Sequence, residues 1–259
     1  AGDWKYRIGL SLTGFPPAPI SPVQSSSYPT VLFNAMVKPW TAFPIKGVIW
    51  YQGEANVGRS EQYGDLFPAL ITDWRRQWRS DFPFYFVQLA NFMESKKIQP
   101  DSEWAALREA QTKALKLDQV GMAVTIDIGL ADDIHPKNKQ EVGRRLALVA
   151  LAGSYGKNVS SSAPVFQNYI IKGNKMELDF GQKQDGFQIK GTTLKGFTIA
   201  GPDRVFYPAE AMVHDGKIIL SSTEVPAPLA ARYGWADNPD CNLYGENGLP
   251  VAPFRTDCW

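Results

Sequence analysis

The sequence has few of the residues that most often carry metal or redox chemistry. Its 259 residues include two histidines, His135 and His214, and two cysteines, Cys241 and Cys258. The histidines are far apart and no cysteine pair lies near either, so we expect no metal and no cofactor. His214 precedes an Asp-Gly turn, where we expect a surface residue. The cysteines fit either a disulfide that closes a short loop or two free thiols, and both alternatives stay open.

The sequence also lacks a surplus of charge and a long apolar run. Its 27 basic and 26 acidic residues leave a net charge of +1, without a basic stripe or an acidic tail. Nucleic acid and anionic membranes are therefore poor candidates as partners. The longest apolar run, residues 146–152, is far too short to span a bilayer. The chain starts at Ala1 with neither Met nor a signal peptide, which we interpret as processing or truncation, so the missing signal leaves the compartment open.

Strand and helix patterns alternate between residues 45 and 157. Apolar runs predict buried strands at residues 47–51, 82–89 and 121–128. Apolar spacings of three and four predict a helix at residues 60–79, with Ser60 as N-cap. We also expect helices at residues 102–117 and 137–152, the second apolar almost all round, and a short helix at residues 34–40 before the alternation begins. This alternation predicts an α/β layer sandwich with a parallel sheet, which we assign to a first domain at residues 1–157.

The helical pattern ends after about residue 156. Short strand-like segments separated by glycine turns follow, at residues 175–180, 187–190, 197–200, 211–213 and 217–221. Asp215-Gly216 between the last two is typical of a hairpin turn. We therefore predict a smaller β-rich domain at residues 158–259, whose tail from residue 232 onward we expect to be ordered loop.

Two polar clusters follow predicted strands, where ligands bind in open α/β sheets. Asp132 lies three residues before His135, so its carboxylate can orient the imidazole for general-base work. The alternative is a loop in which aspartate caps the next helix. Gln52 and the backbone N–H of Gly53 can stabilise an oxyanion. The alternative there is a turn that only holds neighbouring loops.

These clusters lie in segments that resemble the sialate O-acetylesterases of the SGNH hydrolase superfamily. The segments are residues 47–56 (GVIWYQGEAN), 84–90 (FYFVQLA), 107–111 (LREAQ), 132–148 (DDIHPKNKQEVGRRLAL) and the tail from residue 231. The resemblance implies a partial SGNH-like three-layer sandwich, hydrolysis of acetyl esters on sugars, and a periplasmic or secreted location. It covers most of the chain from about residue 29.

The resemblance also implies roles for single residues. The base is His135, its partner Asp132, and Gln52 helps to form the oxyanion hole. Gly53 and Asn56 support the site, and so does Glu54, which we expect to pair with Arg108.

The family's nucleophile is the serine of a Gly-Gln-Ser-Asn motif, which this sequence lacks. Neither Ser11 nor residues 25–27 lie in such a motif or in a Gly-x-Ser-x-Gly elbow. We therefore expect a C-terminal fragment whose serine belongs to a missing N-terminal part of the same protein or to a second chain.

Three hypotheses remain at this point. The parent protein deacetylates sialic acids, or it acts on acetylated xylan or another plant glycan. Alternatively, the chain is a non-catalytic carbohydrate-binding piece that uses the aromatic residues around Tyr233 and Trp235. The first two share an O-acetylated sugar as substrate.

Overall fold

The computed structural model describes residues 28–181 and 186–259. The chain divides into two compact units, Ala1–Pro44 and Ile45–Trp259. In the first unit, the described residues form a π-helical turn, Phe33–Val37, and a 3-10 helix, Lys38–Trp40. These two turns confirm the short helix predicted at residues 34–40. All of the predicted site residues belong to the second unit.

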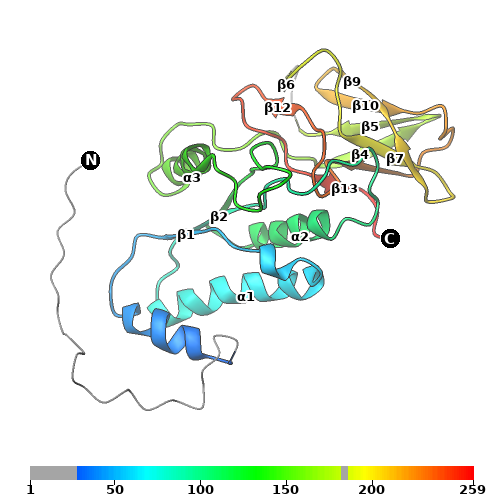
Figure 1. The fold of residues 1–259 in the computed structure, drawn as a ribbon. Coiled ribbons are helices and arrows are strands. Elements are labelled where there is room, and N and C mark those ends of the chain that lie inside the picture. Colours follow the sequence, from blue (N-terminus) through cyan, green and yellow to red (C-terminus); the bar gives the residue numbers. More distant parts are fainter. Residues whose placement is uncertain (1–27, 182–185) are drawn as a thin grey trace. The chain divides into compact units, whose positions relative to one another are not determined.

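The second unit begins with a three-stranded parallel sheet between helices (Figure 1). Strands β1 (Val48–Trp50), β2 (Phe84–Val87) and β3 (Val120–Ala123) lie in the order β1-β2-β3. Helices α1 (Ser60–Trp78) and α2 (Glu103–Thr112) pack on one face, and α3 (Lys139–Gly153) packs on the other. This is the predicted α/β sandwich.

Alternating side chains along β2 connect these layers. Phe84 and Phe86 face α1 and α2, where both rings lie against Phe67. Tyr85 and Val87 face α3. All four β2 side chains are buried, and fully burying one such side chain contributes about 1.5–3 kcal/mol. A strand that is apolar on both faces is therefore stable only between two helical layers, as in parallel sheets.

β1 forms an edge of the described sheet. We predicted a buried strand there, but the side chain of Ile49 is 69% exposed because no described strand pairs with the outer side of β1. Because exposed strand edges are an aggregation hazard, we expect either the N-terminal segment, with residues 6–12 as a candidate, or a second protein molecule to cover this edge. Residues 6–12 lie outside the described residues.

Two local predictions in the α/β part need correction. Ser60 is the first residue of α1, and Arg59 precedes it without a side-chain cap, so the prediction of Ser60 as N-cap is wrong. The strand predicted at residues 121–128 ends at Ala123. Beyond it, the carbonyl of Val124 accepts a hydrogen bond from Arg145 and not from a neighbouring strand.

The remaining chain forms antiparallel sheets, as predicted. One sheet has the order β4-β5-β10-β9 and another β13-β11-β7-β8, while β12 pairs with β6. The strands are β4 (Asn168–Lys172), β5 (Lys175–Asp179), β6 (Phe187–Ile189), β7 (Phe197–Ala200), β8 (Phe206–Pro208), β9 (Glu210–His214), β10 (Lys217–Ser221), β11 (Ala230–Tyr233), β12 (Leu243–Gly245) and β13 (Phe254–Arg255). Buried side chains of the two four-stranded sheets share one apolar core.

The hairpin between β9 and β10 turns at Asp215-Gly216, as predicted. Both residues have positive φ, 48° and 72°. Such a pair matches the type I′ turn, whose twist suits a two-residue hairpin.

The tail from residue 232 is more regular than the predicted loop, because it includes β12, β13 and the end of β11. It also binds the α/β part: Arg255 makes two hydrogen bonds of 2.8 Å to the carboxylate of Glu109 on α2. The division into domains 1–157 and 158–259 stays a prediction.

Both cysteines are free thiols in the structure. Burial raises the pKa of Cys241 to about 12, so its thiol stays protonated at neutral pH. Because disulfide formation requires a thiolate, Cys241 is poorly reactive in this environment. Among the described helices, none combines the length and the apolar composition that a membrane crossing requires.

Arg108 joins the tail to the sheet from the centre of the molecule. It is fully buried on α2 and donates hydrogen bonds to the carbonyls of Leu89 and Ala90, both at 2.9 Å, and of Ala236 and Asp237, both at 2.7 Å. Burial lowers the pKa of Arg108 to about 9, so the guanidinium stays charged at neutral pH. One side chain therefore bonds four carbonyls from two distant segments. Those of Ala90 and Asp237 also accept from Trp104 Nε1 and from the N–H of Phe92.

We expect Arg108→Ala to destabilise the protein by about 3–5 kcal/mol, because it leaves buried carbonyls unpaired and opens a cavity. Urea unfolding followed by tryptophan fluorescence measures the loss. Arg76→Ala is the matched control: Arg76 is exposed on α1 and, within residues 28–181 and 186–259, forms an ion pair with Asp73 alone, so we expect a change below about 1 kcal/mol. Equal effects of the two substitutions would contradict the role given to Arg108.

Candidate functional site

The carboxyl end of β1 carries a glutamine whose amide is held on both sides. Gln52 Nε2 donates to Asn56 Oδ1 at 2.7 Å, and Gln52 Oε1 accepts from the hydroxyl of Tyr63 at 3.2 Å. Asn56 ends the 3-10 turn Glu54–Asn56, and Tyr63 lies in the first turns of α1. Since an amide nitrogen has two hydrogens, one N–H of Gln52 is left for another acceptor.

Gln111 on α2 fixes the backbone at the same place. Its buried amide donates to the carbonyls of Gln52 (3.2 Å) and Val87 (3.3 Å) and accepts from the N–H of Leu89 at 2.9 Å. It thereby links the ends of β1 and β2. Gly53 is buried beside it with φ of 154°, a conformation that side chains with a Cβ avoid.

His135 lies in the loop of residues 124–138, between β3 and α3. Its side chain is 86% exposed, and Nδ1 lies 3.7 Å from Asp133 Oδ1, too long for a hydrogen bond. The same oxygen accepts the backbone N–H of His135 at 2.9 Å. This local turn places Asp133 beside the ring. The structure gives no contact between His135 and Asp132, whose catalytic role stays a prediction.

The two clusters lie at the same edge of the sheet. Because β2 lies between β1 and β3, the two strand ends are separated by about 10 Å, twice the spacing of neighbouring strands. Gln52 and His135 make no hydrogen bond with each other. The topology therefore brings the start of the 124–138 loop to the edge of the sheet at which Gln52 follows β1.

The predicted pairing of Glu54 with Arg108 is wrong. Arg108 bonds backbone carbonyls on the side of the tail, and no ion pair joins it to Glu54 among the described residues. Arg108 acts on the sheet end through the carbonyls of Leu89 and Ala90. Glu54 stands close enough to Tyr51 for its charge to contribute, after burial, to raising the pKa of that phenol to about 12.

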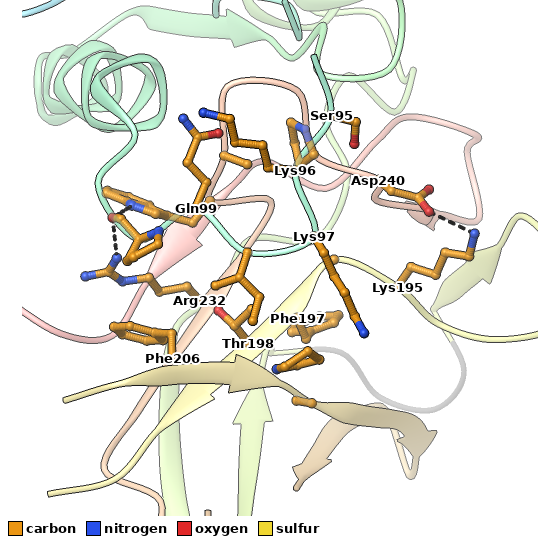
Figure 2. A pocket seen from close by; sticks show the side chains of 18 of the residues that line it. Ser95, Lys96, Lys97, Gln99, Lys195, Phe197, Thr198, Phe206, Arg232 and Asp240 are labelled. Carbon is orange, nitrogen blue, oxygen red and sulfur yellow. Dashed lines mark hydrogen bonds and ion pairs between the residues drawn. The ribbon is translucent and has the colours of Figure 1, made fainter. Parts of the chain in front are cut away.

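A cavity of about 480 Å³ lies between residues 95–100 and strands β7 and β8. Figure 2 shows Lys97, Phe206 and Arg232 around it. Neither Gln52 nor His135 belongs to its lining, so this space is not the predicted site.

The aromatic residues proposed for carbohydrate binding are engaged elsewhere. Tyr233 is 1% exposed, and its hydroxyl accepts the N–H of Leu243. The ring of Trp235 lies 5.0 Å from the guanidinium of Arg232 and 4.8 Å from that of Arg255. These contacts favour a packing role for both aromatics.

Sequence reasoning missed three residues that shape the site. Tyr63 and Gln111 hold Gln52, and Asp133 lies nearer to His135 than expected. Gln111 belongs to the LREAQ segment, where its position on α2 was readable but its partners were not. For Asp133 a signal was present in the sequence, since the side chain of Asp often accepts the backbone N–H of the residue two positions later, which here is His135.

Among the residues that the structure describes, no three His, Cys, Asp or Glu side chains are grouped to hold a metal ion.

Comparison with known proteins identifies the family. Residues 19–152, more than half of the chain, match the family described as carbohydrate esterase, sialic acid-specific acetylesterase. The chain belongs to this family. It is 32% identical to the sialate O-acetylesterase of Pongo abelii and 31% identical to that of Homo sapiens, in each case over 97% of this chain and 54% of the relative.

A solved structure gives the same picture. A carbohydrate acetylesterase from Xanthomonas citri superposes with a TM-score of 0.85 at 46% identity, over 89% of this chain and 55% of that one. The chain thus spans about half the length of these relatives. At this identity, the shared fold extends to both the α/β part and the β-rich part.

Gly53→Ala should destabilise the protein by about 1–3 kcal/mol because its backbone conformation is strained for alanine. The added Cβ would also lie 3.1 Å from Gln111 Nε2 and 3.3 Å from Leu89 Cδ2. Gly143→Ala is the control: Gly143 lies in α3 and its Cβ would meet nothing within 4 Å, so we expect stabilisation by about 0.5–1 kcal/mol. Thermal unfolding of both variants measures this; the same sign for both would contradict the tight fit at Gly53.

Proposed function

We propose that this chain supplies the histidine base and an oxyanion donor of a carbohydrate O-acetylesterase. One observation carries the proposal: the amide of Gln52 is held at the end of β1, in the same sheet whose β3 leads into the loop of His135. The family membership supports the same chemistry. The proposed substrate is an O-acetylated sugar.

In this proposal, ester hydrolysis proceeds in two acyl-transfer steps. His135 Nε2 takes the proton of a serine hydroxyl as the serine oxygen bonds to the acetyl carbon, and the carbonyl oxygen becomes an oxyanion. A free N–H of Gln52, with the N–H of Gly53, stabilises that charge. The imidazolium then gives its proton to the departing sugar oxygen. Water attacks the acetyl-serine by the same route and releases acetate.

The serine is proposed to come from a further segment of the same protein or from a second chain. The sequence contains no Gly-Gln-Ser-Asn motif, and Ser11 and residues 25–27 lie outside the described residues. Two features at this edge support an additional neighbour. Ile49 of β1 is exposed, and the hydroxyl of Tyr51, directly after β1, is buried without a partner among the described residues. A strand that covers this edge would also remove an aggregation hazard.

The sugar itself is proposed in two versions. The mammalian relatives carry the name sialate O-acetylesterase, which favours acetylated sialic acid. The bacterial relative is described only as a carbohydrate acetylesterase, so an acetylated plant glycan is the alternative. The periplasmic or secreted location stays a prediction.

The purified chain alone should release acetate from 9-O-acetylated sialic acid or p-nitrophenyl acetate no faster than the buffer, because in this proposal the nucleophilic serine belongs to another segment or chain. Adding the remaining part of the protein, or expressing both together, should restore hydrolysis. Colorimetric acetate release measures both. Turnover of the chain alone that is abolished by a serine-directed covalent inhibitor would refute the missing-serine proposal.

In the complemented protein, Gln52→Ala should reduce kcat by about 10²–10³-fold, the usual effect of losing one oxyanion donor. His135→Ala should reduce kcat by several orders of magnitude, since base and nucleophile act together. Asp132→Asn and Asp133→Asn form a matched pair that identifies the carboxylate which orients the ring. A Gln52→Ala variant with a higher KM and an unchanged kcat would instead make Gln52 a substrate-binding residue.

A further inference from the structure

The loop that carries His135 is closed at its base by one arginine. Arg145 on α3 is 5% exposed and donates to Val124 O at 2.7 Å and to both oxygens of Asp127 at 2.6 and 2.9 Å. Its Nε donates to Glu141 Oε1, in the first turn of α3, at 2.8 Å. Val124 and Asp127 begin the loop, while Glu141 follows its end. Arg145 therefore links the start of the 124–138 loop to the first turn of α3, which follows the loop.

A side chain from the β-rich part completes this clasp. The hydroxyl of Tyr244 on β12 donates to Asp127 Oδ2 at 3.1 Å. Burial first, and then the charge of Asp127, raise the pKa of Tyr244, so the phenol stays protonated and acts as a donor. Lys190 Nζ lies over the ring of Tyr244, 3.7 Å from its centre. The carboxylate of Asp127 thus receives three hydrogen bonds, from α3 and from β12.

Further contacts fix the same half of the loop. Thr125 Oγ1 donates to Gln88 O at 2.6 Å, and the N–H of Gly129 donates to Asn91 Oδ1 at 2.7 Å. Leu130 pairs with Phe92 as an isolated parallel bridge. By contrast, the ring of His135 is exposed and has no hydrogen bond among the described residues. Its position depends on how well the base of the loop is held.

We propose that Arg145, Asp127 and Tyr244 are positioning residues, which clasp the base of the 124–138 loop and so hold His135 at the carboxyl edge of the sheet. The proposal rests on the proposed function of His135 as base. It makes the β-rich part a working component of the site, since Tyr244 belongs to β12. The three residues act through the backbone of the loop and touch neither substrate nor nucleophile.

The chain offers a direct readout, because it contains only two histidines, His135 and His214. Selective ¹³C labelling of histidine gives two imidazole signals, which His214→Gln assigns. Tyr244→Phe removes a single hydroxyl. We expect it to shift or broaden the His135 signal and to leave the His214 signal unchanged, since His214 lies on the distant hairpin strand β9.

Hydrogen exchange of residues 124–138 provides a second measurement. Loss of one hydrogen bond to a carboxylate should speed local opening, and hence amide exchange, by about tenfold. Arg145→Lys keeps the charge but loses the two-pronged guanidinium that binds both oxygens of Asp127. We expect it to increase the exchange rate more than Tyr244→Phe does. The control Tyr169→Phe changes a partly exposed tyrosine of β4 that makes no hydrogen bond to this loop, and both readouts should equal those of the wild type.

A folded Tyr244→Phe protein with an unchanged His135 signal and unchanged exchange in residues 124–138 would overturn the proposal. So would equal changes in both histidine signals, which would indicate a general loosening. The outcome is separable from that of the proposed function: if His135→Ala left the acetate release of the complemented protein intact, His135 would not be the base, whatever the clasp does to its loop.

Discussion

The carboxyl edge of the sheet depends on one buried charge. Arg108 binds two carbonyls that follow β2 and two from the tail near residue 237. A buried guanidinium is tolerable only when its N–H groups are bonded, and here the backbone bonds four of them. The tail must therefore return to the sheet for Arg108 to be buried at all. This requirement couples the β-rich part to the α/β part.

The same device recurs around the site. Gln111 bonds the backbone at the ends of β1 and β2, and Arg145 bonds the backbone that follows β3. In each case a polar side chain of a helix donates hydrogen bonds to backbone carbonyls at or just beyond the end of a strand. Buried backbone groups need partners, and beyond the strand ends these come from side chains as well as from the bridge between Phe92 and Leu130. Helix side chains thus determine where these loops lie, and with them Gln52 and His135.

Local patterns predicted the layers but not these bonds. Apolar periodicity identified the three helices and the three strands, and Asp215-Gly216 identified its hairpin, because such signals lie within a few residues of one another. The bonds of Arg108 span 128 and 129 residues toward the tail, and nothing near Arg108 in the sequence specifies them. The sequence-based prediction paired the charge of Arg108 with the charge of Glu54. In the structure, Arg108 donates to backbone carbonyls instead. Asp133 was missed for the opposite reason, because two adjacent aspartates compete and the turn geometry decides between them.

The two sides of the site differ in how completely they are built. The amide of Gln52 is fixed by Asn56 and Tyr63. The backbone N–H of His135 is bonded to Asp133, whereas its ring makes no hydrogen bond with the part of the chain that the structure describes. Oxyanion stabilisation requires donors that are oriented before charge develops. A base, in contrast, exchanges its proton with a nucleophile and a leaving group, so part of its environment belongs to them. Under the proposed function, the geometry of His135 therefore depends most on the serine-bearing segment or chain, while the proposed clasp at Arg145 limits where the histidine can lie.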